Sequence, residues 1–417
     1  MKIADLYKLY IQHGLVDTDT RNIRKNTLFF ALKGDNFNGN KFANDALKKG
    51  AKFAIIDESE FKTSDAIILV EDVLKTLQEL ASYHRKILAI PIIAITGSNG
   101  KTTTKELINT VLSLKYNTTA TKGNLNNHIG VPLTLLSMTK ATEIGIVEMG
   151  ANHLNEIAFL SKMINPDYGY ITNFGSAHLE GFGSLEGVVK AKSELYDYLI
   201  KNNKKVFVNS KDAIQIEKTK NASIILFEDS LILLDASPFV KLSFKSIQIA
   251  TNLIGTYNFS NICAAITIGT FFNVPVKKIK ESLENYFPSN NRSQVIDTDC
   301  NKIILDAYNA NPTSMEAALE SFKVFSANSK VIILGDMFEL GEYSDKEHQS
   351  IVDLATSFNF DKLFFVGENF YKTENKHFMF KTFDDLKNYL QENPLNKKSI
   401  LIKGSRGMAL ERVVKFC

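Results

Sequence analysis

The clearest chemical pattern in the sequence is a short glycine-containing loop at residues 97–102. It reads Gly-Ser-Asn-Gly-Lys-Thr, follows an apolar run at 92–95, and precedes residues 106–114, whose apolar positions have helical spacing. Glycines let backbone N–H groups curve around phosphate oxygens, and a helix N-terminus adds partial positive charge. Lys101 is predicted to reach the β- and γ-phosphates of a nucleoside triphosphate, and the Thr102 hydroxyl to bind Mg²⁺. The spacing is two residues shorter than GxxxxGK[ST], so a chance glycine turn is the alternative.

Two polar features follow this loop. Residues 123–130 place asparagines and a histidine between glycines, and a solvated turn explains them as well as a substrate contact does. Glu148 lies near the end of a predicted buried strand over 142–149. Strand ends face the ligand crevice in open α/β sheets, where a carboxylate can hold the Mg²⁺ that bridges two phosphates. A surface glutamate is the alternative.

His178 also follows a predicted strand, at 168–172, and Lys192 lies on the next predicted helix, at 185–200. Lys192 falls inside the apolar stripe of that helix, seven residues after Leu185. Desolvation lowers the pKa of a lysine that points inward. Its neutral amine could react with CO₂ to give a carbamate, an anionic ligand for a second metal ion. The alternative is a lysine whose amine reaches solvent at the helix edge.

The remaining polar motifs lie in the second half of the chain. Asn258 and Asn261 share a face of a helix predicted over 252–272, where they could read an adenine edge or simply cap the helix. In the last third, several polar loops follow predicted strands, and so many such loops in one domain are hard to explain as solvated surface loops alone. These motifs are Asn291-Arg292-Ser293 and residues 306–312, 335–341 and 403–406.

Three α/β units are needed to position these residues. At 417 residues the chain is long enough for two or three domains. Residues 1–86 are predicted to form a small α/β domain, and 87–290 a central P-loop domain with a mostly parallel sheet. Residues 291–417 restart the alternation as a Rossmann-like domain. The fold class is therefore α/β with three domains.

Composition narrows the class of protein. Hydrophobic content of 44% and charged content of 23% fit a globular protein with a large core, and the net charge of +3 indicates no nucleic-acid partner. Three widely spaced cysteines suit neither a disulfide framework nor a zinc site. The N-terminus lacks the apolar segment of a signal peptide, and the longest apolar run is too short to cross a bilayer. We expect a cytoplasmic monomer with no membrane insertion.

Taken together, the motifs resemble the Mur ligase family of ATP-dependent amide ligases over essentially the whole chain. The most specific motifs lie at 96–102, 177–184, 306–312, 335–341 and 403–406. The last four favour the members that add D-alanyl-D-alanine to UDP-N-acetylmuramoyl-tripeptide. The Asp-Asn-Pro-Arg motif of the diamino-acid-adding ligase is absent.

The resemblance implies a two-step reaction. ATP would phosphorylate the tripeptide carboxylate, and the amine of D-alanyl-D-alanine would displace phosphate from the acyl phosphate, giving the pentapeptide precursor of peptidoglycan. The implied cofactors are ATP, two Mg²⁺ ions and a CO₂-derived carbamate on Lys192. The alternatives are another amide ligase of the family, such as the diamino-acid-adding ligase or a folylpolyglutamate synthase, and a non-catalytic nucleotide-gated binding module.

The resemblance also implies roles for individual residues. The expected catalytic residues are Lys101, His178 and carbamylated Lys192, and the expected metal ligands are Thr102, Glu148, His178 and Lys192. The expected ATP contacts are Thr96, Gly97, Ser98, Asn99, Gly100, Lys101, Thr102, Thr103, Asn258, Asn261, Arg292 and Asp306. The expected substrate contacts are Thr20, Arg21, Lys33, Asn126, Asn127, Tyr308, Asn309, Asn311, Lys403, Ser405 and Arg406. The chain departs from the family's usual Arg, Asp and His at Asn36, Asn38 and Asn40.

Overall fold

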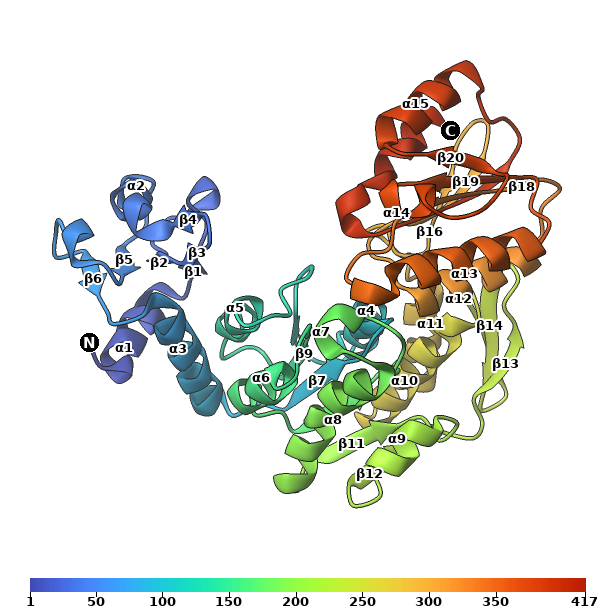
Figure 1. Ribbon diagram of the computed structural model, residues 1–417. Coiled ribbons are helices and arrows are strands. Elements are labelled where there is room, and N and C mark those ends of the chain that lie inside the picture. The colour runs from blue at the N-terminus through green and yellow to red at the C-terminus, as the bar shows by residue number, and fades with distance from the viewer.

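The computed structural model describes residues 1–417 as three α/β parts, each built around its own sheet (Figure 1). The N-terminal and C-terminal parts attach to opposite sides of the central part. The predicted α/β class is confirmed. None of the helices combines the length and the apolar composition needed to cross a bilayer.

The N-terminal part has a four-stranded parallel sheet in the order β1-β2-β5-β6 and a short hairpin, β3-β4. Its strands are β1 (Val16–Asp17), β2 (Leu28–Phe30), β3 (Lys33–Gly34), β4 (Phe37–Asn38), β5 (Phe53–Ile56) and β6 (Ile67–Leu69). Its helices are α1 (Ile3–His13), α2 (Ala43–Lys48) and α3 (Val73–Leu88). Asp72 caps α3, which packs against α1 and against the central helices α5 (Gly130–Leu136) and α6 (Glu156–Ile164).

The central part is organised around a six-stranded parallel sheet in the order β12-β11-β10-β7-β9-β8. Its strands are β7 (Ile92–Thr96), β8 (Thr118–Ala120), β9 (Ile144–Glu148), β10 (Tyr168–Ile171), β11 (Lys205–Val208) and β12 (Ser223–Leu226). Alternate β7 side chains enter different hydrophobic clusters: Ile92 and Ala94 face one, Ile93 and Ile95 the other. Burial on both faces explains why this strand is continuously apolar.

Helices cover this sheet, and the central part also contains a separate antiparallel sheet. The remaining helices are α4 (Lys101–Leu112), α7 (Leu179–Phe182), α8 (Leu185–Lys201), α9 (Ala213–Lys218), α10 (Tyr257–Phe271) and α11 (Val276–Glu284). The antiparallel sheet contains β13 (Ile232–Asp235), β14 (Phe239–Phe244) and β15 (Ile247–Ile254). The helix prediction over 252–272 is therefore wrong at its start. Residues 252–254 belong to β15, whose side chains alternate between exposed and buried positions, and the helix begins at Tyr257.

The C-terminal part has a six-stranded sheet in the order β16-β17-β21-β18-β19-β20, parallel except for β16. Its strands are β16 (Gln294–Asp297), β17 (Lys302–Asp306), β18 (Lys330–Gly335), β19 (Lys362–Val366), β20 (Phe378–Phe380) and β21 (Ser399–Lys403). Its helices are α12 (Pro312–Val324), α13 (Ser344–Ser357), α14 (Glu368–Tyr371) and α15 (Phe383–Glu392).

A buried histidine joins the N-terminal and central parts. His84 of α3 lies between Tyr7 and Tyr10 of α1, with Nδ1 3.2 Å from the Tyr7 hydroxyl and Nε2 2.9 Å from the Met138 carbonyl. The Tyr10 hydroxyl donates to the Leu136 carbonyl at 2.6 Å. Burial lowers the pKa of His84, and the hydrogen bond with Met138 opposes this with a smaller effect.

Acidification is therefore expected to weaken this junction. The unfolded chain takes up the proton at a higher pH than the folded chain, so the stability tied to neutral His84 is lost as the pH falls below its ordinary value of 6.5. His84→Gln keeps a side chain that stays neutral. Melting temperatures measured from about pH 8 to about pH 5.5 should fall more steeply for the wild type than for the variant. Parallel curves would contradict the prediction.

Candidate active site

A cavity of about 490 Å³ lies between the central and C-terminal parts. Only 4 of its 30 lining residues are hydrophobic, so its walls suit a strongly polar ligand. Eighteen of the residues predicted from the sequence line it. They are Ser98, Asn99, Gly100, Lys101, Thr102, Thr103, Asn126, Asn127, Glu148, His178, Asn258, Asn261, Arg292, Asp306, Tyr308, Asn309, Asn311 and Lys403.

The glycine loop connects β7 to α4 at the edge of this cavity, and two of its positions require glycine. Gly97 has φ of +140°, and a Cβ there would lie 2.0 Å from the Thr172 hydroxyl oxygen. Gly100 has φ of +77°, and a Cβ would lie 2.7 Å from Asn261 Oδ1. The helix α4 begins directly after the loop, at Lys101. The strand, loop and helix N-terminus therefore have the arrangement that binds phosphate.

Lys101 lies close against the loop. Its amine donates to the carbonyls of Gly97 at 2.7 Å and Ser98 at 3.0 Å. Burial lowers the pKa of Lys101 to about 8, with a further lowering by Arg292 and an opposing effect of Glu148. The amine is thus held at the loop by two neutral carbonyls, and bound phosphate oxygens would give it negatively charged partners.

Thr102 and Glu148 form a small oxygen cluster beside the loop. Thr102 Oγ1 donates to Glu148 Oε1 at 3.1 Å, and Asn126 Nδ2 donates to the same oxygen at 2.8 Å. Glu148 Oε2 is buried without a hydrogen-bond partner, although Lys105 Nζ lies 3.8 Å away. No group of three or more His, Cys, Asp or Glu side chains in the chain is arranged to hold a metal ion by itself. Mg²⁺ needs only one or two carboxylates beside phosphate and water, so the pair fits this ion.

Lys192 is buried, so the alternative of an amine that reaches solvent at the helix edge is wrong. Its amine donates to the Ala151 carbonyl at 3.2 Å and lies 5.0 Å from the centre of the Phe182 ring. The His178 ring lies 6.3 Å from the same phenyl ring. Burial lowers the pKa of Lys192 to about 7, with a further lowering by Lys101. His178 and Lys192 thus approach the same phenylalanine, although only His178 lines the cavity.

Asn258 and Asn261 line the cavity and also connect α10 to its neighbours. Asn258 Nδ2 donates to the Ile254 carbonyl at 2.8 Å, and Asn261 Nδ2 donates to Asn258 Oδ1 at 2.9 Å. Asn261 Oδ1 accepts from the Thr104 hydroxyl of α4 at 3.0 Å. This chain of bonds differs from helix capping, which would use the first backbone N–H groups of α10.

The C-terminal wall of the cavity carries a second charged cluster. The Arg292 guanidinium lies 3.7 Å from the centre of the Tyr308 ring. Asp306 accepts from the buried Lys403 amine at 2.6 Å, and the same amine reaches the Asn309 carbonyl at 3.2 Å. Sequence motifs that follow β17 and β21 therefore meet at one edge of the sheet, as expected for parallel strands.

The two walls also contact each other directly. Asn311 Nδ2 donates to Oδ1 of Asn99 in the glycine loop at 2.8 Å, and the Thr313 hydroxyl accepts from the Ser176 N–H at 3.0 Å. Asn311 also caps α12 by accepting from the Ser314 N–H at 2.9 Å. Asn311 was predicted to contact substrate. In this structure it connects the C-terminal part to the glycine loop.

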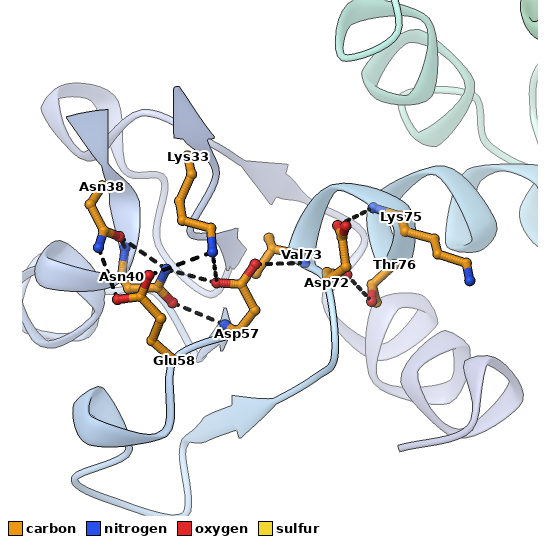
Figure 2. Close-up of polar contacts among 9 residues, drawn as sticks. All are labelled: Lys33, Asn38, Asn40, Asp57, Glu58, Asp72, Val73, Lys75 and Thr76. Carbon is orange, nitrogen blue, oxygen red and sulfur yellow. Dashed lines mark hydrogen bonds and ion pairs between the residues drawn. The ribbon is translucent and has the colours of Figure 1, made fainter. Parts of the chain in front are cut away.

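Eight predicted site residues lie outside the cavity, three of them in the N-terminal part. Arg21 is exposed and pairs with Asp19 at 2.7 Å, next to Thr20 in a short 3₁₀ turn. Figure 2 shows Lys33 between two carboxylates, with its amine 3.0 Å from Asp57 and 3.5 Å from Glu58. The structure does not bring these three residues to the glycine loop.

Two of the three asparagines that depart from the family pattern, Asn38 and Asn40, support the same region of the N-terminal part (Figure 2). Buried Asn40 donates to Asp57 Oδ1 at 2.9 Å and accepts from the Asp57 backbone N–H at 2.9 Å. Asn38 donates to Glu58 at 2.9 Å and accepts from the Asn40 side chain. The other oxygen of Asp57 accepts from the Val73 N–H at the start of α3. The network ties the β3-β4 hairpin to the helix that leads into the central part.

The other five lie near the cavity but do not line it. Gly97 belongs to the loop, and the Lys192 amine contacts Phe182 and the carbonyl of Ala151, which lines the cavity. Thr96 is buried and donates to the Met149 carbonyl at 2.8 Å, and Ser405 accepts from the Phe338 N–H at 2.9 Å. Arg406 is exposed, with its guanidinium 5.4 Å from the Tyr308 ring centre.

Twelve lining residues were not predicted individually. They are Asn124, His128, Gly150, Ala151, Asn152, Glu156, Asn173, Tyr257, Ser293, Thr313, Ser314 and Ala317. Asn124 and His128 belong to the polar loop at 123–130, and Asn173 directly follows the predicted strand at 168–172. Their positions in a polar motif or directly after a strand could have identified them as site residues.

Comparisons with known proteins agree along the whole chain. Residues 14–85 match the Mur ligase family catalytic domain, 95–269 the Mur ligase middle domain, and 291–411 the Mur ligase glutamate ligase domain. The chain is 35% identical to UDP-N-acetylmuramoyl-tripeptide–D-alanyl-D-alanine ligase of Bacillus subtilis, over 98% of the chain and 94% of the relative.

Solved structures show the same similarity. A crystal structure of MurF from Acinetobacter baumannii is 31% identical with a TM-score of 0.82, covering 96% of this chain and 92% of that one. MurF ligase from Thermotoga maritima, in complex with ADP, is 26% identical with a TM-score of 0.86, covering 100% of this chain and 98% of that one. The chain therefore belongs to the Mur ligase family.

Proposed function

We propose that the chain is an ATP-dependent, ADP-forming amide ligase that joins D-alanyl-D-alanine to UDP-N-acetylmuramoyl-tripeptide, a step of peptidoglycan synthesis. The observation that carries this function is the shared cavity. It has a phosphate-binding loop on one wall, and Arg292, Asp306 and Lys403 on the other. The full-length similarity to curated ligases with this activity supports the same conclusion and disfavours the non-catalytic alternative.

The reaction couples two transfers. An oxygen of the tripeptide carboxylate attacks the γ-phosphorus of ATP, the bond to the β-phosphate oxygen breaks, and ADP leaves. The amine of D-alanyl-D-alanine then attacks the acyl carbon, the bond to the phosphate oxygen breaks, and phosphate leaves as the amine loses a proton. Lys101 and the loop N–H groups hold the phosphates, and Asn258, Asn261, Arg292 and Asp306 contact the rest of ATP.

Two Mg²⁺ ions would supply charge neutralisation at the crowded phosphate oxygens. Thr102 and Glu148 would hold the first ion, and the orphaned Glu148 oxygen supports this assignment. His178 and carbamylated Lys192 would hold the second. The lowered pKa of Lys192, about 7, supports carbamate formation because only the neutral amine reacts with CO₂.

The three parts of the chain would divide the work. Residues 1–86 would bind the UDP-sugar with Thr20, Arg21 and Lys33. Residues 87–290 would bind ATP and, with Asn126 and Asn127, the peptide end. Residues 291–417 would bind D-alanyl-D-alanine with the residues near Tyr308 and Arg406. An acyl phosphate hydrolyses readily, so docking of the C-terminal part would exclude water.

We place this enzyme in the cytoplasm as a monomer.

The choice of amine tests this function. With UDP-N-acetylmuramoyl-tripeptide and ATP present, phosphate release is expected to depend on D-alanyl-D-alanine. A diamino acid, L-glutamate and buffer alone serve as controls in the same assay. Release that depends on the diamino acid or on glutamate would favour another ligase of the family. ATP binding without amine-dependent turnover would favour a binding module.

A further inference from the structure

Hydrogen bonds to several other segments hold residues 336–338, which directly follow β18. Buried Asp336 accepts two backbone N–H bonds from the start of α14, each at 2.9 Å. The Met337 N–H donates to His348 Nε2 at 3.0 Å, and the Phe338 N–H donates to Ser405 Oγ at 2.9 Å. The side chains of His348 and Ser405 and two backbone N–H groups of α14 thus fix the direction in which the next residue, Glu339, projects.

Glu339 reaches from this loop to the central part. It has φ of +62°, a left-handed conformation that non-glycine residues rarely adopt. Its carbonyl accepts from the Glu180 N–H at 3.2 Å, and its carboxylate Oε2 contacts Nδ1 of His178. A strained backbone that delivers one side chain to a candidate active-site residue indicates a functional constraint.

The two ring nitrogens of His178 have different surroundings. His178 lines the cavity, whereas Glu339 does not. The carboxylate therefore lies at the Nδ1 edge of the ring, where Nδ1 is buried without a hydrogen-bond partner and a proton on Nδ1 would face the carboxylate. The lone pair is then at Nε2, which is the nitrogen left to act on the cavity side.

We infer that Glu339 is a positioning residue for the ligase reaction. From the C-terminal part it holds the imidazole of His178, so that Nε2 is presented to the cavity only while the C-terminal part is docked. This inference rests on the proposed role of His178 as a metal ligand. A carboxylate that orients a metal-binding histidine from behind is a general way to fix ring direction and tautomer. Here the carboxylate comes from a different part of the chain than the histidine.

The consequence is a link between docking and metal binding. Tyr343 donates to the Gly183 carbonyl at 3.2 Å, and Gly341 packs near Glu180, so the same C-terminal segment contacts both ends of the short helix α7 that follows His178. Undocking would remove Glu339 from His178 together with these contacts. The second ion would then be held weakly until substrates are enclosed, which limits wasteful hydrolysis of the acyl phosphate.

The test compares Glu339→Ala and Glu339→Gln with two matched controls in the full-length enzyme. Glu342→Gln changes an exposed carboxylate on the same segment, and Tyr343→Phe removes a different bond between the two parts. Binding of Mn²⁺ is followed by electron paramagnetic resonance in the presence of a non-hydrolysable ATP analogue, and kcat is measured against Mg²⁺ concentration. Affinity for the analogue itself is measured by calorimetry.

Glu339→Ala is expected to weaken the second Mn²⁺ and raise the Mg²⁺ requirement by about 10–100-fold. Analogue affinity should be unchanged, and Glu339→Gln, which still accepts a hydrogen bond, should recover part of the loss. Both controls should match the wild type. Wild-type Mn²⁺ binding in Glu339→Ala would overturn the inference, as would tighter binding or an equal defect in Tyr343→Phe.

His178→Ala separates this inference from the proposed function. If His178→Ala loses the second Mn²⁺ and Glu339→Ala does not, only the role of Glu339 is wrong. If His178→Ala binds both ions as the wild type does, the metal role of His178 is wrong and the inference about Glu339 falls with it.

Discussion

Lys192→Ala is expected to reduce amide formation by about 10²–10³-fold, since one preorganised stabilising group in an active site contributes about that much. Burial lowers the pKa of Lys192 to about 7. About half of the amine is then neutral near pH 7, against roughly 1 in 3,000 for an unperturbed lysine. This difference makes Lys192 a suitable site for a carbamate, and an ordinary surface lysine a poor one.

Lys190 provides the matched control because it is exposed on the same helix. Lys190→Ala should keep wild-type activity. Small carboxylates should partly restore Lys192→Ala, where truncation leaves space, and should fail to restore Lys192→Met, whose side chain occupies that space. Melting temperatures check that all three variants fold. The absence of rescue in a folded Lys192→Ala variant would contradict the carbamate assignment.

Local sequence patterns predicted those parts of the site that are built from residues close together in the sequence. The glycine loop could be recognised because a buried strand, two glycines and a helix start follow within a few residues. Helical spacing placed Lys192 in the apolar stripe of α8, which left an inward and a solvent-reaching lysine as alternatives, and the resemblance to the family favoured the inward one. The parallel order of strands in the central and C-terminal parts follows from alternating strands and helices.

Contacts between distant segments could not be predicted in this way. Asn311 binds Asn99 across the cavity, and Glu339 contacts His178, yet neither pair has a local signal in the sequence. Both contacts depend on how the C-terminal part docks on the central part, which is set by side-chain packing over hundreds of residues. The β13–β15 sheet was missed for a different reason: its strands are neighbours in the sequence, but the last of them leads almost directly into an apolar helix and was assigned in part to that helix.

The N-terminal residues Thr20, Arg21 and Lys33 show another limit. The resemblance placed them in the substrate site, but the structure holds Lys33 in a network with Asp57 and Glu58, away from the glycine loop. An extended substrate such as a UDP-sugar peptide can connect two regions that do not touch. The sequence motifs identify residues in both regions, but they do not predict the distance between the regions.

Lys101→Met is expected to have the largest effect on turnover, about 10³-fold or more, because one cation at a transferring phosphoryl group contributes about 10³–10⁵-fold. Single-turnover formation of ADP measures the phosphoryl step directly. Lys122→Met serves as the control, since Lys122 is exposed and does not line the cavity. ADP formation within about tenfold of the wild-type rate would remove Lys101 from the phosphoryl step.

The same substitution should leave the fold at least as stable. Burial lowers the pKa of Lys101 to about 8, from an ordinary value of 10.5. Burial therefore disfavours the charged amine in the folded chain. Below pH 8 the charge on Lys101 lowers the free energy of unfolding, and an uncharged methionine would not lower it. An equal or higher melting temperature near pH 7, together with the lost phosphoryl transfer, would identify Lys101 as a residue kept for chemistry at the expense of stability. A clear fall in melting temperature would instead mean that the lost turnover reflects a damaged glycine loop.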